Sequence, residues 1–527
     1  MADGTGLFDG VFSRGGPGTG SGAWLRAMLD TEAALARALE RAGLAPAGAG
    51  EAVTAATLAP FDAGELGRRA ALTGNPVPAL VAELRKAVPP AVADTVHQGA
   101  TSQDIIDTAA MLLARRALAA IAADLAAAAD GCAALARDHH GTLMIGRTLL
   151  QQAVPVTFGL VAAGWLTGLD EARENVARVR AHRLAVQFGG AAGTLAPLGA
   201  DGPAVAALLA AELGLGVPVL PWHTDRSRII DIAAACAGAG AALAKIARDV
   251  TLLAQSEVGE VTEGGGVEVG EAAGDAGATG SGGAAGVTES GGDTGVVGSG
   301  GAAGVTGSGG AAGVIGSGGA AGVSGSGGAA GVSGGGDAAG GSGVRRGGSS
   351  AMPHKHNPVA AIAILGCTRR LPGLVATLVA AAEQEHQRAA GAWHAEWEPF
   401  GDLLRLTGSA ASWGAELAGG LVVDPARMRA NLDAARGLPL AEQVSGLLAP
   451  ALGPAAAHDL VARASADAVA AGITLRAALL GRPGVRRQLD AAGITPGQID
   501  AALDPARYLG AAAAFTDAAL AAHARRS

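Results

Sequence analysis

The 527-residue sequence has few aromatic residues, few cysteines and no excess of positive charge. Aromatic residues make up 3% of the chain against 49% for all hydrophobic residues, so alanine and leucine must fill most of the core, which favours helices over strands. The formal net charge of −9 excludes an overall basic surface of the kind that binds nucleic acid. The three cysteines lie far apart without metal-ligand spacing, which predicts buried thiols in a reducing compartment.

Two kinds of hydrophobic segment are also missing. Residues 1–20 contain no basic stretch followed by an apolar run, so we expect no signal peptide. The alanine-rich stretches are broken by charges, so we expect no membrane-spanning segment. These absences predict a soluble, cytoplasmic protein.

What the sequence does contain is helical periodicity. Apolar residues recur at helical spacing from Trp24 to Leu39, and Gly43 ends that pattern. Longer helices are predicted from Ile105 to Ala136, from about Arg147 onward and from Ser227 to about Val258. The last would be about 48 Å long at 1.5 Å per residue, which favours an extended bundle. We therefore predict an all-α fold of three helical domains, comprising residues 1–104, 105–421 and 422–527.

A glycine-, alanine- and serine-rich tract interrupts the middle domain at residues 263–343. It contains no leucine, aromatic residue, proline, lysine or arginine, and valine recurs every nine residues. Calcium-binding β-rolls share that period but need a regular aspartate that these units lack. The composition favours a flexible tract without calcium, because it offers too little apolar surface to offset the entropy of ordering it.

The stretch Gly347–Pro358, which reads GGSSAMPHKHNP, carries the strongest chemical signal. Its glycines permit movement, a serine hydroxyl can exchange a proton, and Lys355 and Asn357 can offset negative charge on a bound anion. The alternative is a polar surface loop between helices. A second candidate anion site is the Thr101-Ser102 pair, whose residues are natural caps for the helix that follows. Plain capping is the structural alternative there.

Several blocks resemble the fumarase/aspartase superfamily, in the superfamily's order. They are GATSQD at 99–104, GRTLLQQAVP at 146–155, SEVGEV at 256–261 and GSSAMPHKHNP at 348–358. More narrowly, FDGVF at 8–12, PWHTDRSR at 221–228, QEHQR with WHAEW within 384–397, and LDPARYLG at 503–510 resemble the 3-carboxy-cis,cis-muconate cycloisomerase family. The resemblance covers about residues 6–262 and 344–527, and the glycine-rich tract departs from it.

The resemblance implies a homotetramer whose middle domains form a twenty-helix core, with each site assembled from three subunits. The implied reaction interconverts 3-carboxy-cis,cis-muconate and 4-carboxymuconolactone by acid/base addition and elimination, without metal or organic cofactor. Because the substrate is a small tricarboxylate, several cations and N–H groups are expected around it. The implied catalytic residues are Ser349, Lys355, Asn357 and His97. The implied substrate-binding residues are Thr101, Ser102, Arg147, Thr148, Gln151, Arg228, Ser350, Met352, His386 and Arg388.

One position departs from many lyase relatives, which carry histidine where this chain has Leu149. Leucine cannot move protons, which argues against an argininosuccinate or adenylosuccinate lyase and is compatible with the cycloisomerases. His97 and His386 remain possible acid/base partners, although a lone histidine is more often structural. Two alternative functions stay open: a lyase of the adenylosuccinate type, and a non-catalytic structural homologue that uses the glycine-rich tract as a linker.

Overall fold

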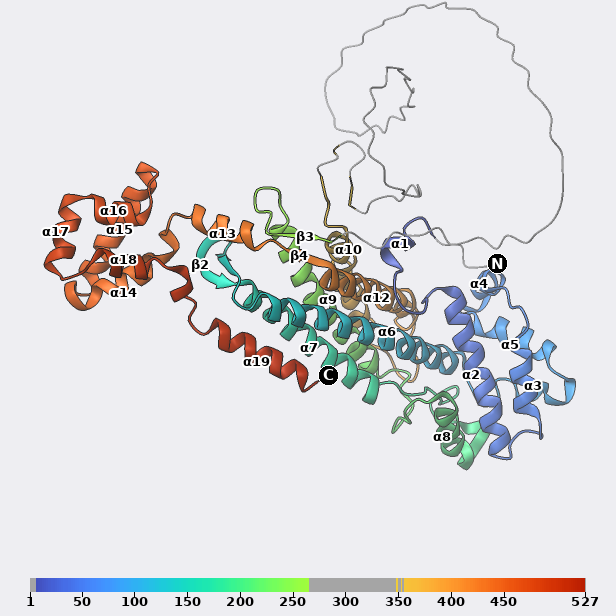
Figure 1. Ribbon diagram of the computed structural model, residues 1–527. Coiled ribbons are helices and arrows are strands. Elements are labelled where there is room, and N and C mark those ends of the chain that lie inside the picture. Colours follow the sequence, from blue (N-terminus) through green and yellow to red (C-terminus); the bar gives the residue numbers. More distant parts are fainter. Residues whose placement is uncertain (1–5, 265–346, 349–351, 353–354, 527) are drawn as a thin grey trace, which may run out of the picture. The chain divides into compact units, whose positions relative to one another are not determined.

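The computed structural model describes residues 6–264, 347–348, 352 and 355–526. Within these ranges helices dominate, and the strands form two short antiparallel pairs (Figure 1). The all-α fold class predicted from the sequence is confirmed. The predicted tract 263–343 lies outside the described residues except for Glu263 and Gly264, and Glu263 belongs to a strand.

The N-terminal part of the chain is a set of short helices around one longer helix, α2 (Ser21–Arg41). This helix packs against α3 (Ala49–Ala56), α6 (Ser102–Asp138) and α8 (Gly202–Leu213). The helix ends at Arg41, two residues before its predicted end at Gly43. Gly43 has a φ of 73°, a left-handed conformation that favours glycine and stops the helix. The other elements here are α1 (Asp9–Phe12), α3 (Ala49–Ala56), α4 (Ala63–Thr73), α5 (Val77–Ala87) and a 3₁₀ turn (Pro90–Thr95).

Long helices form a bundle at the centre of the described chain. Its members are α6 (Ser102–Asp138), α7 (Phe158–His182), α9 (Ser227–Leu253), α10 (Val359–Thr368), α11 (Leu371–Ala380) and α12 (Trp397–Gly420). Helix α6 packs against α7 and α12, and α9 packs against α7, α10 and α12. The chain that follows the loop forms two helices, α10 and α11, and Pro372 lies in the first turn of α11, because proline cannot continue the hydrogen-bond ladder of the preceding helix.

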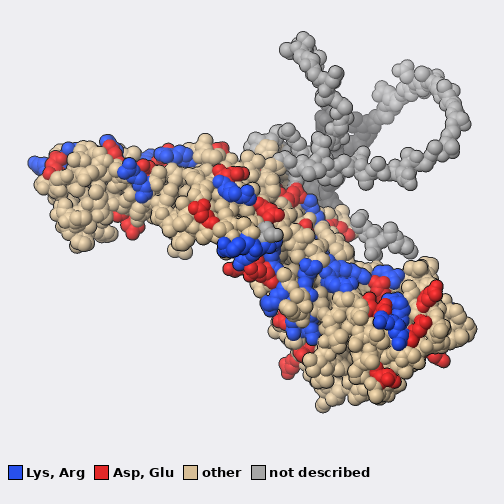
Figure 2. Space-filling view, turned by 60° about the horizontal axis from the view of Figure 1, so that its bottom comes forward, with Lys and Arg blue, Asp and Glu red and all other residues tan. Residues whose placement is uncertain are grey.

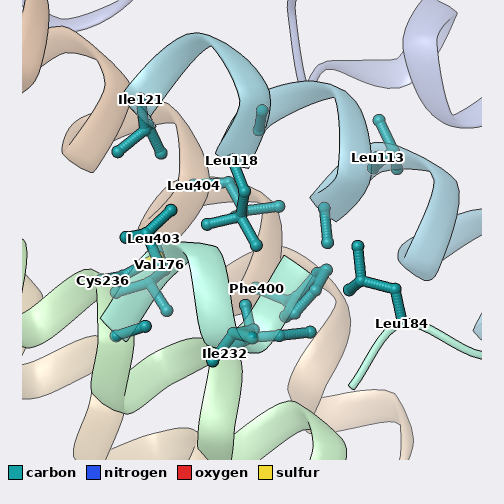
Figure 3. Close-up of a cluster of buried hydrophobic side chains, with 14 of the residues drawn as sticks. Leu113, Leu118, Ile121, Val176, Leu184, Ile232, Cys236, Phe400, Leu403 and Leu404 are labelled. Carbon is teal, nitrogen blue, oxygen red and sulfur yellow. The ribbon is translucent and has the colours of Figure 1, made fainter. Parts of the chain in front are cut away.

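The bundle core is made of aliphatic side chains contributed by four helices. Leu118 of α6, Val176 of α7, Ile232 of α9 and Leu403 of α12 point toward one another (Figure 3), and all four are fully buried. Small residues let these helices approach closely; a Cβ at Gly414 would overlap the Leu243 side chain. Interdigitated aliphatic packing of this kind supplies the main favourable term for folding.

A β-hairpin separates α6 from α7, and here the sequence prediction was wrong. The segment beginning at Arg147 was expected to open a helix. Instead β1 (Leu143–Thr148) pairs with β2 (Gln151–Thr157), and α7 begins only at Phe158. Leu149 and Leu150 form the two-residue turn with φ values of 51° and 63°. Two-residue hairpin turns need such positive φ angles, which leucine rarely adopts.

The C-terminal part of the chain begins where β4 (Leu421–Val423) pairs with β3 (Val261–Glu263). Beyond it, residues between Val444 and Ala502 form a second buried cluster, distinct from the bundle core. The last helix returns to pack on α7. The helices are α13 (Pro425–Ala434), α14 (Ala441–Leu452), α15 (Pro454–Ala471), α16 (Leu475–Gly481), α17 (Pro483–Ala491), α18 (Pro496–Ala502) and α19 (Ala512–Ala524), and α8 (Gly202–Leu213) lies earlier, between α7 and α9.

The cysteines and the charged side chains follow the sequence analysis. Cys132, Cys236 and Cys367 are free and buried, and burial raises the pKa of Cys132 and Cys236 to about 12. Their burial is as predicted, and because burial also raises the pKa of Cys367, the structure indicates unreactive thiols. On the face shown in Figure 2, Lys and Arg side chains lie beside Asp and Glu in mixed groups.

Among the described residues, three bundle segments are long and apolar enough to cross a membrane by length and composition alone. They are Ser102–Asp138, Ser227–Leu253 and Val359–Ala380, and a fourth span is counted if the bent pair α15–α16 is taken as one. The prediction of no membrane-spanning segment relied on interrupting charges, and these segments contain too few charges to support it. Only 39% to 50% of each apolar window is buried within this chain, so much apolar helix surface remains uncovered.

Candidate active site

A buried carboxylate organises the start of α6. Asp104 accepts hydrogen bonds from the backbone N–H groups of Thr101 at 3.0 Å and Gly190 at 2.9 Å, and its Oδ1 lies 2.7 Å from Nε2 of His223. Asp104 and His223 are both buried. The first turn of α6 is thereby joined to two loops that are 86 and 119 residues away in sequence. This anchoring fixes the backbone around the predicted Thr101-Ser102 pair.

One turn further along α6 lies a buried group of three charges. The Arg226 guanidinium is held between Asp107 at 2.8 Å and 3.0 Å and Glu396 at 2.5 Å to 3.1 Å. Trp393 donates its indole N–H to Asp107 at 3.0 Å. Burial raises the pKa of Glu396 to about 7, and the nearby negative charge of Asp107 adds to the rise, although Arg226 opposes it. Burial also acts on Arg226, but its two carboxylate partners raise its pKa.

His97 lies in the loop that leads into α6. Its Nδ1 is 2.6 Å from Oε1 of Glu32, a fully buried residue of α2. Burial acts to lower the pKa of His97, but Glu32 outweighs it and the pKa is raised. The loop turns at Gly99, where φ is 76° and a Cβ would overlap the side chain of Leu198. Glycine is therefore required there.

Two further predicted residues reach this end of the bundle. Arg388 donates to the Oγ1 of Thr101 at 2.9 Å, and its guanidinium lies 5.9 Å from the ring centre of Trp393. Burial lowers the pKa of Arg388, an effect that Asp104 and Asp107 oppose. His386 is exposed, and its carbonyl oxygen accepts from Thr224 at 3.3 Å. We call the group formed by His97, Thr101, Ser102 and Arg388 the capped end of the bundle.

Arg147, Thr148 and Gln151 lie on the β1–β2 hairpin. The guanidinium of Arg147 makes a bidentate ion pair with Glu260, with both distances 2.8 Å, and Asn431 donates to the same carboxylate at 2.8 Å. Glu260 is fully buried. Arg147 is thus occupied by a carboxylate of its own chain, while Thr148 and Gln151 are exposed.

The loop that precedes α10 is described only in part. Ser349 and Ser350 lie outside the described residues. Lys355 is exposed, and Asn357 donates from its side chain to the Gly347 carbonyl at 3.3 Å. Met352 is 42% exposed, and its carbonyl accepts from the Lys355 backbone at 3.0 Å. The start of α10 is held by Glu263, whose carboxylate accepts from the N–H groups of Ala360 and Ala361 at 3.1 Å and 3.0 Å.

The predicted residues gather at opposite ends of one helix. The capped end lies at the N-terminus of α6, and the hairpin with Arg147 follows its C-terminus. Glu260 forms an ion pair with Arg147 of the hairpin. Three residues later, Glu263 accepts a hydrogen bond from the start of α10. These two contacts place Lys355 and Asn357, which directly precede α10, near the hairpin. Helix α6 has 37 residues and is about 55 Å long, so no small substrate can touch the residues at both ends of α6 within one chain. We call the second group, formed by Arg147, Lys355 and Asn357, the hairpin end.

Arg228 belongs neither to the capped end nor to the hairpin end. It is half-buried at the start of α9, where its Nη1 donates to the Arg183 carbonyl at 2.9 Å. Burial lowers its pKa, and the nearby Arg183 adds to that effect. Two residues earlier, Arg226 is the buried member of the same sequence block.

Sequence reasoning missed the buried partners Glu32, Asp104, Asp107, Arg226 and Glu396. Asp104, Arg226 and Glu396 lie inside the blocks GATSQD, PWHTDRSR and WHAEW, and Asp107 lies three residues after the first of them. Membership in or next to these blocks could have marked the four residues as candidates, but not as partners of one another. Within the described ranges, no three His, Cys, Asp or Glu side chains are grouped as ligands for a metal ion.

Comparison with known families supports the similarities seen in the sequence. Residues 22–265 match the family described as Lyase, and residues 437–519 match the C-terminus of adenylosuccinate lyase. Neither match includes the loop before α10.

Individual relatives match almost the whole chain. A 3-carboxy-cis,cis-muconate cycloisomerase from Bradyrhizobium diazoefficiens is 40% identical over 94% of this chain and 92% of its own length. A nitrosuccinate lyase from Streptomyces davaonensis is also 40% identical, over 94% of this chain and 90% of its own. The crystal structure of the 3-carboxy-cis,cis-muconate lactonizing enzyme from Pseudomonas putida superposes with a TM-score of 0.76 at 36% identity, covering 98% of this chain and 99% of that one.

Proposed function

Because the chain belongs to the fumarase/aspartase superfamily, in the branch that contains the 3-carboxy-cis,cis-muconate cycloisomerases, we propose that it interconverts 3-carboxy-cis,cis-muconate and 4-carboxymuconolactone. The observation that carries this proposal is the sequence identity of 40%, over 94% of this chain, with an enzyme of that name. In the forward direction a carboxylate oxygen forms a bond to one alkene carbon. The π electron pair moves to the neighbouring carbon, which takes one proton.

Groups at both ends of the bundle suit this reaction. Arg388 with Thr101 at the capped end can bind a substrate carboxylate, since guanidinium and hydroxyl groups are its natural partners. Exposed Lys355 and the Asn357 amide at the hairpin end can stabilise the charge that grows on a carboxylate as its neighbouring carbon exchanges the proton. We assign the proton-transfer role to Ser349, with His97 as its acid/base partner, on the superfamily resemblance.

We further propose a homotetramer in which each site combines the ends of different subunits. Two observations support it: the separation of about 55 Å along α6, and the large uncovered apolar surface of α6, α9 and α10–α11. Packing against other copies would bury that surface without a membrane, so we expect a protein that stays soluble in the cytoplasm. Sedimentation without detergent tests this, and a stable monomer at micromolar concentration would contradict it.

The decisive experiment measures loss of conjugated-diene absorbance when purified protein meets 3-carboxy-cis,cis-muconate, with the lactone identified by mass spectrometry. Ser349→Ala and Lys355→Met should each lower kcat by about 100-fold or more, as expected for loss of a group that stabilises developing charge. Circular dichroism must show that both variants remain folded. Wild-type turnover in folded Ser349→Ala protein would overturn the assignment.

A second candidate is elimination from a nitrosuccinate, because a nitrosuccinate lyase is as similar to this chain as the cycloisomerase is. The same preparation is therefore supplied with nitrosuccinate and assayed for released nitrite. The ratio of kcat/KM for the two substrates decides between them. Adenylosuccinate serves as the third substrate, and Leu149 at the exposed hairpin turn leads us to expect no turnover of it.

A further inference from the structure

Glu32 is a buried acid that the superfamily resemblance does not assign to any role. Its side chain has no exposed surface, and its Oε1 lies 2.6 Å from Nδ1 of His97. Its other oxygen, Oε2, is buried without a hydrogen-bond partner in the part of the chain that the structure describes. Burying a carboxylate with one oxygen unpaired opposes folding, so an apolar residue at this place in α2 would be favoured if stability alone mattered.

The backbone of His97 is strained as well. Its φ is 65°, in the left-handed region that residues other than glycine enter uncommonly. Such conformations persist only where the surrounding structure enforces them, and they concentrate at functional sites. Here the short contact to Glu32 and the turn at Gly99 hold the imidazole in one orientation.

This contact fixes where the imidazole carries its proton. With Glu32 ionised, its oxygens only accept hydrogen bonds, so Nδ1 donates to Glu32. The neutral ring then has its lone pair on Nε2, and the charged ring has an N–H there. In the described part of the chain no residue is hydrogen-bonded to Nε2, and the side chain keeps 17% of its surface exposed.

We propose that Glu32 is a positioning residue that holds the His97 imidazole with Nδ1 protonated, so that Nε2 exchanges the proton of the reaction at the capped end. The proposed proton exchange at Nε2 rests on the proposed function. The protonation of Nδ1 by the contact with Glu32 does not. Glu32 lies on α2, outside the sequence blocks that carry the superfamily resemblance. Two further charged groups act on His97: Asp104 of α6 stabilises its charged form, and Arg85 of α5 opposes it.

The first test is spectroscopic and needs no turnover. Histidine is labelled with ¹⁵N, the solid-state NMR signals of the 11 histidines are recorded, and His97 is identified by its loss in His97→Gln. At high pH the neutral His97 ring of the wild-type protein should carry its proton on Nδ1. In Glu32→Gln the ring should lose its proton at a lower pH than in the wild type. A wild-type ring protonated on Nε2 would overturn the proposal.

The second test is kinetic. Glu32→Gln should lower kcat by at least about 10-fold, as expected when the group that orients a catalytic imidazole is removed. KM should stay within about 3-fold, and the limb of the kcat/KM profile assigned to His97 should move to lower pH, because the negative charge that favours the imidazolium is gone. Relative to Glu32→Gln, Glu32→Asp should have a higher kcat, and the pH of this limb should lie closer to its wild-type value.

The matched control is Glu40→Gln, the same change on the same helix, where the carboxylate accepts from the N–H groups of Gly48 and Gly50 at 2.7 Å. It should leave the profile unchanged. An unshifted profile in Glu32→Gln would overturn the proposal. If the wild-type protein shows no turnover, the proposed function fails, and the NMR result alone decides the role of Glu32.

Discussion

The ionisation of Glu396 is coupled to folding. Its pKa rises from an ordinary value of 4.5 to about 7 because burial outweighs the attraction of Arg226. The folded protein therefore holds this proton more tightly than the unfolded chain does. The stability that follows is complete below pH 4.5 and is lost as the pH rises through 7.

We predict that Glu396→Gln flattens the pH dependence of stability. In the wild-type protein the urea midpoint should fall as the pH rises through about 7, and in the variant it should fall less, because an uncharged amide at this position leaves Arg226 and Asp107 as a neutral pair. Exposed Glu398, two residues later on α12, provides the control substitution Glu398→Gln, which should keep the wild-type slope. Identical slopes for wild-type protein and Glu396→Gln would refute the prediction.

Single residues were predicted from the sequence where a local rule applied or where the superfamily resemblance assigned them. Thr101 was recognised because a hydroxyl residue directly before an apolar helix is a cap, and the structure places it at the start of α6. The partners of Arg226 are 119 and 170 residues away, so no local pattern could assign them. Arg228 was selected in its place because a single sequence does not distinguish the buried arginine of the pair from the half-buried one.

The β1–β2 hairpin is the element for which the sequence-based prediction of a helix was wrong. Its turn residues are leucines, whereas the residues typical of such turns are asparagine, aspartate and glycine. Pro155 could be read as a helix-opening proline, but it lies in β2 opposite Ile145, next to an irregularity in the strand register. The long bundle helices were predictable because their apolar period is sustained over many turns.

The same turn gives the second prediction. Leu149 is 96% and Leu150 76% exposed, and both adopt strained φ angles. In a tetramer we expect this turn to contact another subunit, so the double variant Leu149→Asn/Leu150→Gly should weaken assembly while relieving strain of about 1–2 kcal/mol per leucine. Sedimentation over a dilution series measures the first effect, and thermal unfolding of the dissociated chain measures the second.

Leu72→Asn is the control, because Leu72 is 86% exposed but lies on α4 among the N-terminal helices. It should assemble like the wild-type protein. If the hairpin variant also sediments like the wild type at every concentration, the turn does not contact another subunit.

At the scale of the whole molecule, the separation of the two ends predicts complementation. Arg388→Ala disables the capped end and Lys355→Met the hairpin end, so each variant alone should be inactive. After subunit exchange in a 1:1 mixture, about one site in four should combine two intact ends and regain activity. Mixed tetramers that are shown by native mass spectrometry but remain inactive would contradict a site shared between subunits.

The glycine-rich tract provides the fourth prediction. Glu263 is held by strand β3 and the start of α10, so the chain is anchored at the first residue of the tract. Because loop-closure entropy changes by only about 0.6 kcal/mol per doubling of length, removing residues 266–342 should alter stability little. We expect tetramer assembly and kcat/KM within a few-fold of the wild type. A folded but inactive deletion variant would give the tract a function of its own.

The length of α6 also has a consequence for how activity appears over time. In the proposed tetramer, a chain whose capped end and hairpin end lie about 55 Å apart can complete its fold without completing an active site. During refolding from denaturant, helical signal should therefore return as a first-order process that is independent of protein concentration. Catalysis should return later and with a higher order in concentration. In a cell that makes little of this protein, the reaction rate would then rise more steeply than the number of chains.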